Sequence, residues 1–303
     1  MAAREAASVP PSGWAGTRRK EDLKTTDMEQ ERHPFQNIVA ETLLIPLYMR
    51  AKESRRGPEA ILHDPMAEQL VEKIDYDYGR LDTAPLSEVG CVVRGWYFDR
   101  AVKRFVDACP GEAVVVNVGC GLDTRWQRLA DRRATFYELD LPEVIDLRRR
   151  LIPEPAADRY LAASLLDTDW MDTLRSNHPE ARFIFVAEGV LMYFYESQVR
   201  SFVRAVARRF GGGELWFDVC GSMMSRRGLK PDSLRGHQAQ IRSGIDDGRT
   251  VEGWDSRLRL LRQDNYMRFF RPRWGFLYGQ VLGRMTRLCY RFSSLLGYEI
   301  RQV

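Results

Sequence analysis

The chain has few of the side chains that bind metals or form disulfides. Its 303 residues include five cysteines, at positions 91, 109, 120, 220 and 289, and four histidines. The cysteines form no Cys-x-x-Cys pair, and they do not cluster with histidine at the spacing of a metal site. We therefore expect free thiols and no bound metal.

Long apolar runs are missing as well. No run approaches the 18 residues that a membrane-spanning helix needs, and no apolar signal-peptide segment follows the start. The sequence therefore predicts a cytoplasmic protein that has no membrane partner.

Neither sign of charge is in large excess. The chain has 46 Lys and Arg against 42 Asp and Glu, which gives a formal net charge of +4. This excess of positive charge is too small and too dispersed to predict a surface that binds nucleic acid. We expect a small-molecule substrate as the partner, and the sequence leaves the oligomeric state open.

One stretch organises the rest of the chain. The apolar, β-branched run Ala113–Val118 is typical of a strand buried on both faces of a parallel sheet. It ends in Gly119-Cys120-Gly121, where the missing Cβ atoms let the backbone turn sharply and approach a ligand. A second strand, Thr135–Leu139, brings the acids Glu138 and Asp140. A glycine turn and an acid after the next strand are typical of a nucleoside site, in which the carboxylate accepts hydrogen bonds from the ribose hydroxyls.

The residues around the turn favour a cationic cofactor over a dinucleotide. The dinucleotide fingerprint has a third glycine after the second, where this chain has Thr124, and Asp123 would repel a pyrophosphate. The sulfonium and ammonium groups of S-adenosyl-L-methionine would not be repelled. The sequence therefore predicts that Gly119, Gly121 and Asp123 bind this cofactor, with Asp140 preferred to Glu138 for the ribose. Capping of the next helix is an alternative role for Asp123.

Three motifs carry a resemblance to a known family. The segments Val116–Arg125, Tyr137–Val144 and Ala187–Tyr193 resemble, in order and spacing, the leucine carboxyl methyltransferase family and its microbial, polyketide-type O-methyltransferases. The resemblance covers about Glu41 to Val219. It implies an α/β fold with the Rossmann-like sheet of class I S-adenosylmethionine-dependent methyltransferases, an N-terminal helical cap and a C-terminal lid.

This fold predicts four parts of the chain: a flexible tail (1–33), a helical cap (34–109), a cofactor-binding α/β core (110–221), and a substrate lid that also ends the sheet (222–303). Cap helices are expected from Phe35, with a kink or break at Pro46, from Asp64-Pro65, and over Val92–Ala108. Further core strands are expected at 159–163, 182–187 and 214–219. After Gly221 the pattern loosens to about Asp264, and we expect a last helix over 280–296 and a strand over 298–303.

The resemblance also implies roles for further residues. Arg94 matches an arginine that binds the methionyl carboxylate of the cofactor, a role suited to the guanidinium fork. Adenine is expected at Ser164 and Leu165, with Asp167 as a further candidate. Glu188 ends a central strand, where cofactor and substrate meet. A solvated surface charge remains the alternative for Arg94, and an acceptor for loop N–H groups remains the alternative for Glu188.

The implied activity is transfer of a methyl group to a carboxylate or hydroxyl oxygen of a small molecule. A carboxylate acceptor is already ionised at neutral pH, so it needs no general base, whereas a phenol would benefit from one. The sequence identifies no catalytic residue. Tyr193 and His237 are the candidates for positioning the acceptor.

Three other activities remain open at this point. They are NAD(P)-dependent oxidoreduction, carboxyl methylation of a protein C terminus, and binding of the cofactor without turnover. The aromatic residues between Tyr266 and Tyr278, which alternate with arginines, fit either a substrate pocket with a cationic rim or ordinary packing.

Overall fold

The computed structural model describes residues 42–129, 131, 133–226, 229–234 and 239–302. The predicted tail, the start of the first predicted cap helix and the candidate His237 lie outside these residues.

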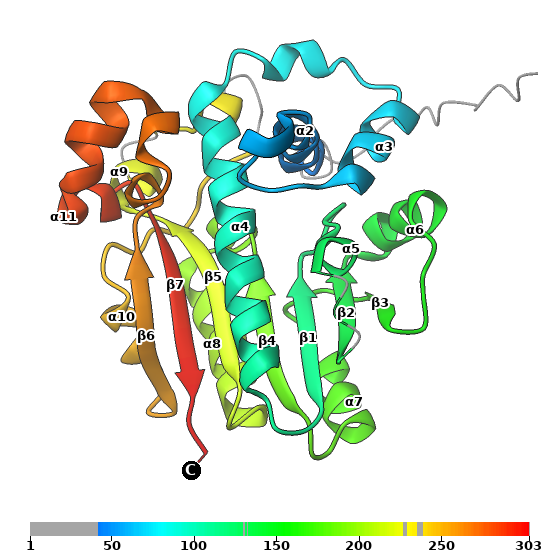
Figure 1. Cartoon of the computed structure of the whole chain (residues 1–303). Coiled ribbons are helices and arrows are strands. Elements are labelled where there is room, and N and C mark those ends of the chain that lie inside the picture. Colours follow the sequence, from blue (N-terminus) through cyan, green and yellow to red (C-terminus); the bar gives the residue numbers. More distant parts are fainter. Residues whose placement is uncertain (1–41, 130, 132, 227–228, 235–238, 303) are drawn as a thin grey trace, which may run out of the picture.

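A seven-stranded sheet with helices on both faces forms the centre of the described fold (Figure 1). The strand order is β3-β2-β1-β4-β5-β7-β6. Strands β1 to β5 pair in parallel, and β7 is antiparallel to both β5 and β6. This is the Rossmann-like, class I α/β fold that the sequence predicts. The strands are β1 (Ala113–Val118), β2 (Ala134–Asp140), β3 (Asp158–Ala162), β4 (Arg182–Ala187), β5 (Glu214–Cys220), β6 (Leu258–Asp264) and β7 (Ser293–Ile300).

The alternation of side chains along each strand divides the core into two layers. On β1, Val114, Val116 and Val118 pack with helices α7 and α8, whereas Val115 packs with α4 on the other face. Because β1 is buried along its whole length, it reads as a continuous apolar run. The helices are α2 (Leu44–Ser54), α3 (Pro65–Lys73), α4 (Pro85–Ala108), α5 (Arg125–Leu129), α6 (Pro142–Leu151), α7 (Asp169–Asn177), α8 (Glu196–Arg209), α9 (Ser222–Ser225), α10 (Arg249–Glu252) and α11 (Thr286–Tyr290).

Local sequence signals explain where several of these helices begin. Asp64 caps α3 by accepting a hydrogen bond from the Ala67 N–H at 3.0 Å, and Pro65 occupies the first helical position, as predicted. The predicted kink or break at Pro46 concerns a helix from Phe35 whose first part lies outside the described residues, and the described helix α2 begins only at Leu44, after a turn. Pro46 lies in the first turn of α2, where no backbone N–H is needed for helical hydrogen bonding. Helix α4 also begins seven residues before the predicted Val92, at Pro85.

The C-terminal part differs most from the prediction. Strand β6 lies in the stretch that we expected to be irregular. The predicted single helix over 280–296 is wrong: a π-helix, a 3₁₀ turn and the short α11 occupy the segment up to Tyr290, and a strand follows. The last residues of the predicted helix, Leu295 and Leu296, belong to β7 instead, because they fill opposite faces of the sheet beside β5. Tertiary packing outweighs local helical spacing in this segment.

The carboxyl ends of the parallel strands lie beneath a roof of helices (Figure 1). Helices α2 and α3 cover the ends of β1 and β2, and the segment around α9 and α11 lies above β5 and β7. Ligands bind at this edge in open α/β sheets. The fold therefore places a covered site at the glycine turn.

Candidate functional site

A single large cavity of about 800 Å³ lies at this edge and runs from the glycine turn to the C-terminal segment. Its volume is within the range of about 300–1,000 Å³ that is typical of small-molecule sites. All the predicted cofactor residues line it: Arg94, Gly119, Gly121, Asp123, Asp140, Ser164, Leu165 and Glu188. Of the two positioning candidates, Tyr193 lines the cavity, and His237 lies outside the described residues.

The glycine turn needs glycine at two positions. Gly119 and Gly121 have φ angles of +66° and +51°, in the left-handed region. A Cβ on Gly119 would lie 2.5 Å from the side chain of Val190, and one on Gly121 would lie 2.9 Å from Leu43. Both glycines therefore let the turn pack directly under the cavity.

Asp140 is held against this turn. Its carboxylate accepts hydrogen bonds from the N–H groups of Gly121 and Leu141, each at 2.8 Å. Burial nevertheless raises the pKa of Asp140 to about 6. Glu138, in contrast, does not line the cavity: it is fully buried and accepts a hydrogen bond from Asn117 at 2.8 Å. The geometry thus supports the preference for Asp140 as the ribose ligand.

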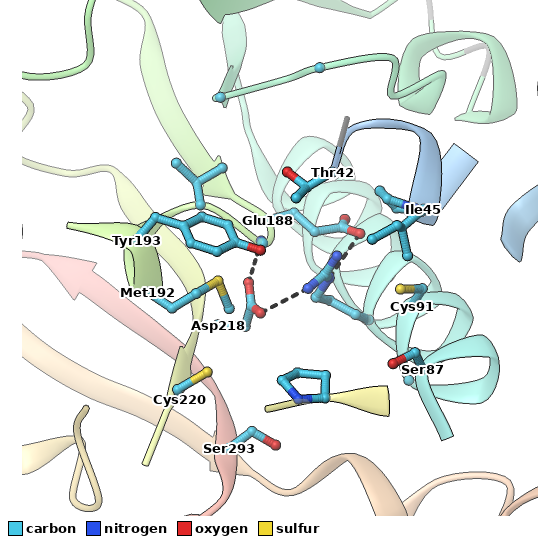
Figure 2. Close-up of a pocket in the computed structure, with 18 of the residues that line it drawn as sticks. Thr42, Ile45, Ser87, Cys91, Glu188, Met192, Tyr193, Asp218, Cys220 and Ser293 are labelled. Atoms are coloured by element: carbon cyan, nitrogen blue, oxygen red, sulfur yellow. Dashed lines mark hydrogen bonds and ion pairs between the residues drawn. The ribbon is translucent and has the colours of Figure 1, made fainter. Parts of the chain in front are cut away.

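Arg94 bridges the carboxylates of Glu188 and Asp218, which line the cavity with it and are labelled in Figure 2. Its Nε donates to Glu188 at 3.1 Å, and its Nη1 donates to Asp218 at 3.0 Å. Burial opposes the charge, but Asp218 and Glu188 together raise the pKa of Arg94 well above its ordinary value. Asp218 also accepts from the Gly189 N–H at 2.6 Å and from the Tyr266 hydroxyl at 2.9 Å. With 12% of its side chain exposed, Arg94 is therefore a residue of the site and not a solvated surface charge.

A second buried arginine supports Glu188 from the opposite side. Arg125, which is 1% exposed, donates to the other Glu188 oxygen at 2.6 Å and to Asp99 on α4 at 2.8 Å. It also lies 2.9 Å from Asp123. Two arginines therefore hold Glu188 in place. Through its contacts with Glu188, Asp123 and Asp99, Arg125 connects the end of β4, the glycine turn and α4.

Asp123 pairs with arginines in addition to its contact with the helix that follows. Its carboxylate accepts from the Thr124 N–H at 2.7 Å and lies 2.8 Å from Arg128. Burial would raise the pKa of Asp123, but Arg125 and Arg128 hold it below its ordinary value, so the group is an anion at neutral pH.

Ser164 and Leu165 follow β3 and line the cavity at the far side of Asp140, whereas the alternative candidate Asp167 does not line it. The Ser164 hydroxyl accepts a hydrogen bond from the Leu166 N–H at 3.2 Å. Leu165 is 8% exposed and contributes apolar surface. Such a pair fits a flat base with one polar edge.

The other half of the cavity is apolar and is built mostly by the C-terminal part of the chain. Tyr193 reaches it from the turn after β4, next to Met192 (Figure 2). Burial raises the pKa of Tyr193, so its hydroxyl stays protonated at neutral pH. Of the predicted aromatic cluster, Tyr266, Trp274 and Tyr278 line this half, and Phe269 and Phe270 pack against Trp96 instead. Lys230 and Arg242 contribute cationic side chains to the lining.

Sequence reasoning missed two central residues, Asp218 and Arg125. Asp218 lies near the carboxyl end of β5, so the argument that identified Glu188 at the end of β4 could have found it too. Arg125 lies inside the first motif, but no local pattern reveals that its side chain turns inward to three carboxylates.

The charges of the cofactor half suit a cationic ligand. Five carboxylates line it against three arginines. The carboxylates belong to Asp123, Asp140, Glu143, Glu188 and Asp218, and the arginines are Arg50, Arg94 and Arg125. An excess of negative charge stabilises the sulfonium and ammonium groups of S-adenosylmethionine and disfavours a pyrophosphate. The residues present therefore fit this cofactor.

Comparison with known proteins gives the same result. The family model for leucine carboxyl methyltransferase matches residues 44–207. The tetracenomycin polyketide synthesis O-methyltransferase TcmP of Streptomyces glaucescens is 34% identical over 226 residues, which cover 74% of this chain and 82% of that protein. The S-adenosyl-L-methionine-dependent methyltransferase dpfgK of Gibberella zeae is 32% identical over 290 residues, which cover 86% and 94% of the two chains.

Solved structures resemble the fold at low sequence identity. A protein of the DUF574 family from Streptomyces avermitilis matches with a TM-score of 0.55 and 12% identity, over 87% of this chain and 99% of that one. A protein from Thermobifida fusca, described provisionally as a methyltransferase, matches with a TM-score of 0.51 and 13% identity, over 84% and 94%.

Family membership excludes the alternative of an NAD(P)-dependent oxidoreductase. In the part of the chain that the structure describes, no helix is long and apolar enough to cross a membrane. The chain belongs to the leucine carboxyl methyltransferase family and is an S-adenosyl-L-methionine-dependent O-methyltransferase.

Proposed function

We propose that the protein methylates an oxygen of a small, largely apolar organic molecule, and that a carboxylate is its preferred acceptor. The observation that carries the proposal is the continuity of the cavity, which joins the acid-rich cofactor half to an apolar, aromatic half. The relative from Streptomyces glaucescens, which is named for polyketide synthesis, supports the same class of acceptor.

The residues of the cofactor half have separate tasks in this proposal. Asp140 would accept the ribose hydroxyls, Ser164 and Leu165 would hold the base, and Arg94 would bind the methionyl carboxylate. The bound cofactor supplies a methyl group made electrophilic by the positive sulfur. Glu188 and Asp218 hold Arg94 from two sides, so its guanidinium is oriented before the ligand arrives.

The acceptor half positions an oxygen and excludes water. Burial raises the pKa of Tyr193 and of Tyr266, so both hydroxyls stay protonated at neutral pH. Tyr266 donates its hydroxyl hydrogen bond to Asp218, and Tyr193 would donate one to the acceptor. The apolar lining from Met192, Trp274 and Leu282 would keep water from the reacting atoms.

The absence of a suited base in the described cavity favours a carboxylate over a hydroxyl. No histidine of the described residues lines the cavity. Glu188 and Asp218 are engaged by arginine. The Asp232 carboxylate accepts from the N–H groups of Leu86 and Ser87. An ionised carboxylate needs no proton transfer before it attacks a methyl group. The cationic side chains of Lys230 and Arg242 also favour an acceptor with a negative charge, such as a carboxylate.

The test measures acceptor-dependent formation of S-adenosylhomocysteine. The panel pairs aromatic carboxylic acids with their own methyl esters and adds phenols and a peptide that ends in leucine. We expect turnover with aromatic acids and none with the matched esters. Turnover with the peptide alone would favour protein C-terminal methylation and contradict the proposal. Turnover with phenols alone would retain the small molecule and overturn the carboxylate preference.

A further inference from the structure

The segment from Phe276 to Met285 exposes an unusual amount of apolar surface. Phe276 is 79% exposed, Leu277 57%, Val281 42% and Met285 50%. Among the described residues, these four are the majority of the strongly exposed large apolar side chains, and the other three are Leu166, Tyr195 and Leu229. Concentrated exposed apolar surface marks an interaction site.

The four side chains share the outer face of one helical stretch. A π-helix, Phe276–Val281, continues into a 3₁₀ turn, Leu282–Arg284, and then into α11. The inner residues Tyr278 and Leu282 line the acceptor half of the cavity. The four exposed apolar residues of the same stretch face outward. Figure 1 shows this stretch at the outer edge of the molecule, over the β6 side of the sheet.

The same part of the chain is strongly cationic. Between Asn265 and Tyr298 there are six arginines and no Asp or Glu. Arg284, Arg287 and Arg291, which are exposed, lie within or directly after the apolar stretch. Apolar side chains flanked by arginine are typical of segments that lie on an anionic membrane surface.

A small polar cavity adjoins this stretch. It has a volume of about 210 Å³ and is lined by Arg268, Arg271, Arg284 and Thr286, with Asp264 as the one carboxylate. Asp264 is neutralised by Arg268, 2.5 Å away, so the cavity keeps a net positive charge. The buried Nε of Arg271 has no hydrogen-bond partner. Guanidinium groups and a hydroxyl in this arrangement suit a phosphate.

We propose that residues 276–291 dock on an anionic lipid bilayer, which departs from the sequence-based expectation of no membrane partner. Phe276, Leu277, Val281 and Met285 enter the interface between headgroups and acyl chains, and a lipid phosphate occupies the arginine-lined cavity. The combination of an outward apolar face, a basic flank and an arginine-lined cavity favours a bilayer over a second copy of the chain, which would bring the same positive charge.

Docking would also bring the acceptor half of the cavity close to the bilayer, because the inner face of the docking segment lines that cavity. An apolar acceptor could then enter from the lipid phase. This consequence rests on the proposed function, whereas the docking itself does not.

The experiment measures sedimentation of the purified full-length protein with vesicles, without cofactor or acceptor. Vesicles of phosphatidylcholine alone are compared with vesicles that contain about one-third phosphatidylglycerol. We expect binding to the anionic vesicles only, weakened by salt. The double variant Phe276→Ser/Leu277→Ser and the double variant Arg284→Ala/Arg287→Ala should each reduce the affinity by at least about tenfold.

Matched controls change exposed residues outside the docking segment. Leu166→Ser removes an exposed leucine next to β3, at the opposite edge of the sheet, and Arg249→Ala removes an exposed arginine on α10. Both should bind vesicles as the wild type does. Thermal unfolding of each variant shows that the fold is intact.

Several results would overturn the docking proposal. These are equal binding to neutral vesicles, binding that the serine substitutions leave unchanged, and a change of oligomeric state in place of vesicle affinity. Titration with inorganic phosphate and glycerol phosphate separates the sources of the ligand. Tight binding of these soluble anions without any vesicle binding would assign the small cavity to a free phosphate compound and overturn the membrane surface.

Discussion

Asp140 combines a ligand-facing carboxylate with an unusual pKa. Two backbone N–H groups favour its anion, but burial dominates and raises the pKa to about 6. If the anion accepts the ribose hydroxyls, the cofactor affinity depends on pH just below neutrality. Protonation below pH 6 removes the acceptor, so the affinity should fall as the pH decreases.

Titration of S-adenosylhomocysteine from pH 8 to pH 5 tests this prediction. In the wild type, the affinity should be constant above the pKa and fall by up to about tenfold per pH unit below it. Asp140→Asn should bind about ten- to a hundredfold more weakly at pH 8 and lose the pH dependence. Asp146→Asn, at an exposed position of α6, serves as the control. An unchanged affinity of Asp140→Asn would remove this residue from the ribose role.

Two further buried acids should make the free energy of unfolding depend on pH. Glu138 and Asp158 are fully buried, and Arg148 Nη2 lies 3.6 Å and 3.9 Å from their carboxylates. Arg148 also donates from Nη1 to the carbonyl oxygens of Gly121 and Asp123, so this cluster supports the glycine turn. Burial and the charge of Glu138 raise the pKa of Asp158 to about 8.

The sign of the pH effect follows from this raised pKa. In the unfolded chain Asp158 loses its proton near pH 4, but in the folded protein it keeps the proton to about pH 8. The free energy of unfolding should therefore decrease as the pH rises through this window, by up to about 1.4 kcal/mol per pH unit. Denaturant unfolding between pH 5 and pH 9 measures it. Asp158→Asn should flatten the profile, and an equally steep profile in that variant would assign the proton elsewhere.

Single residues of the site differ in how well the sequence predicts them. Asp140, Ser164 and Glu188 follow strands, so strand patterns and the motif resemblance place them at the cavity without coordinates. Asp218 needs the additional knowledge that β5 lies next to β4. The inward turn of Arg125 depends on packing between α4 and the glycine turn, which no local pattern contains.

At the scale of elements, the packing of β7 on β5 depends on one close approach. Trp216 on β5 lies under Gly297 on β7, and a Cβ added at Gly297 would meet its ring at 2.4 Å. Gly297→Ala should therefore lower the free energy of unfolding by about 1–3 kcal/mol. Gly111→Ala is the matched control, because a Cβ there meets nothing within 4 Å. Equal effects of the two substitutions in denaturant unfolding would contradict this packing argument.

A helix cap supplied by another segment holds the acceptor half of the cavity against α4. Ala84 gives α4 no side-chain cap, and Asp232 supplies one from another segment by accepting from the N–H groups of Leu86 at 2.9 Å and Ser87 at 3.0 Å. Asp232 and Ser87 both line the cavity.

Removing this cap should loosen the acceptor half and leave the cofactor half intact. Asp232→Ala should lower the free energy of unfolding by about 1 kcal/mol and speed hydrogen exchange of the first α4 amides. The affinity for S-adenosylhomocysteine should stay within about twofold of the wild type. Ser87→Ala, which removes one hydroxyl contact, should have a smaller effect. Unchanged exchange in Asp232→Ala would show that the cap is not needed.

The predictability of elements follows their environment. The strands β1, β4 and β5 are buried along almost their whole length and are mainly apolar, apart from residues such as Asp218 on β5, so composition locates them well. Strand β6 lies at the edge of the sheet, is buried only at its two ends and carries exposed arginines at 259 and 262, so its sequence resembles a polar loop. The 222–302 part was predicted least well for this reason.

At the scale of the whole molecule, one cavity has two halves of opposite character. The strand ends of the core build an acid-rich half for a cationic cofactor, and the C-terminal segment builds an apolar half for the acceptor. The outer face of that same segment forms the proposed docking surface. Acceptor binding and the proposed membrane docking therefore both depend on residues 222–302, the part of the chain whose structure is hardest to predict from the sequence.

The most direct test of the central claim is a crystal structure of the complex with S-adenosylhomocysteine. We expect the ribose hydroxyls within hydrogen-bonding distance of Asp140 and the base between Ser164 and Leu165. The carboxylate of the amino-acid part should contact Arg94. The apolar half beyond Tyr193 should remain open for an acceptor. A ligand bound away from the glycine turn, or one whose ribose does not contact Asp140, would contradict the assignment of the site.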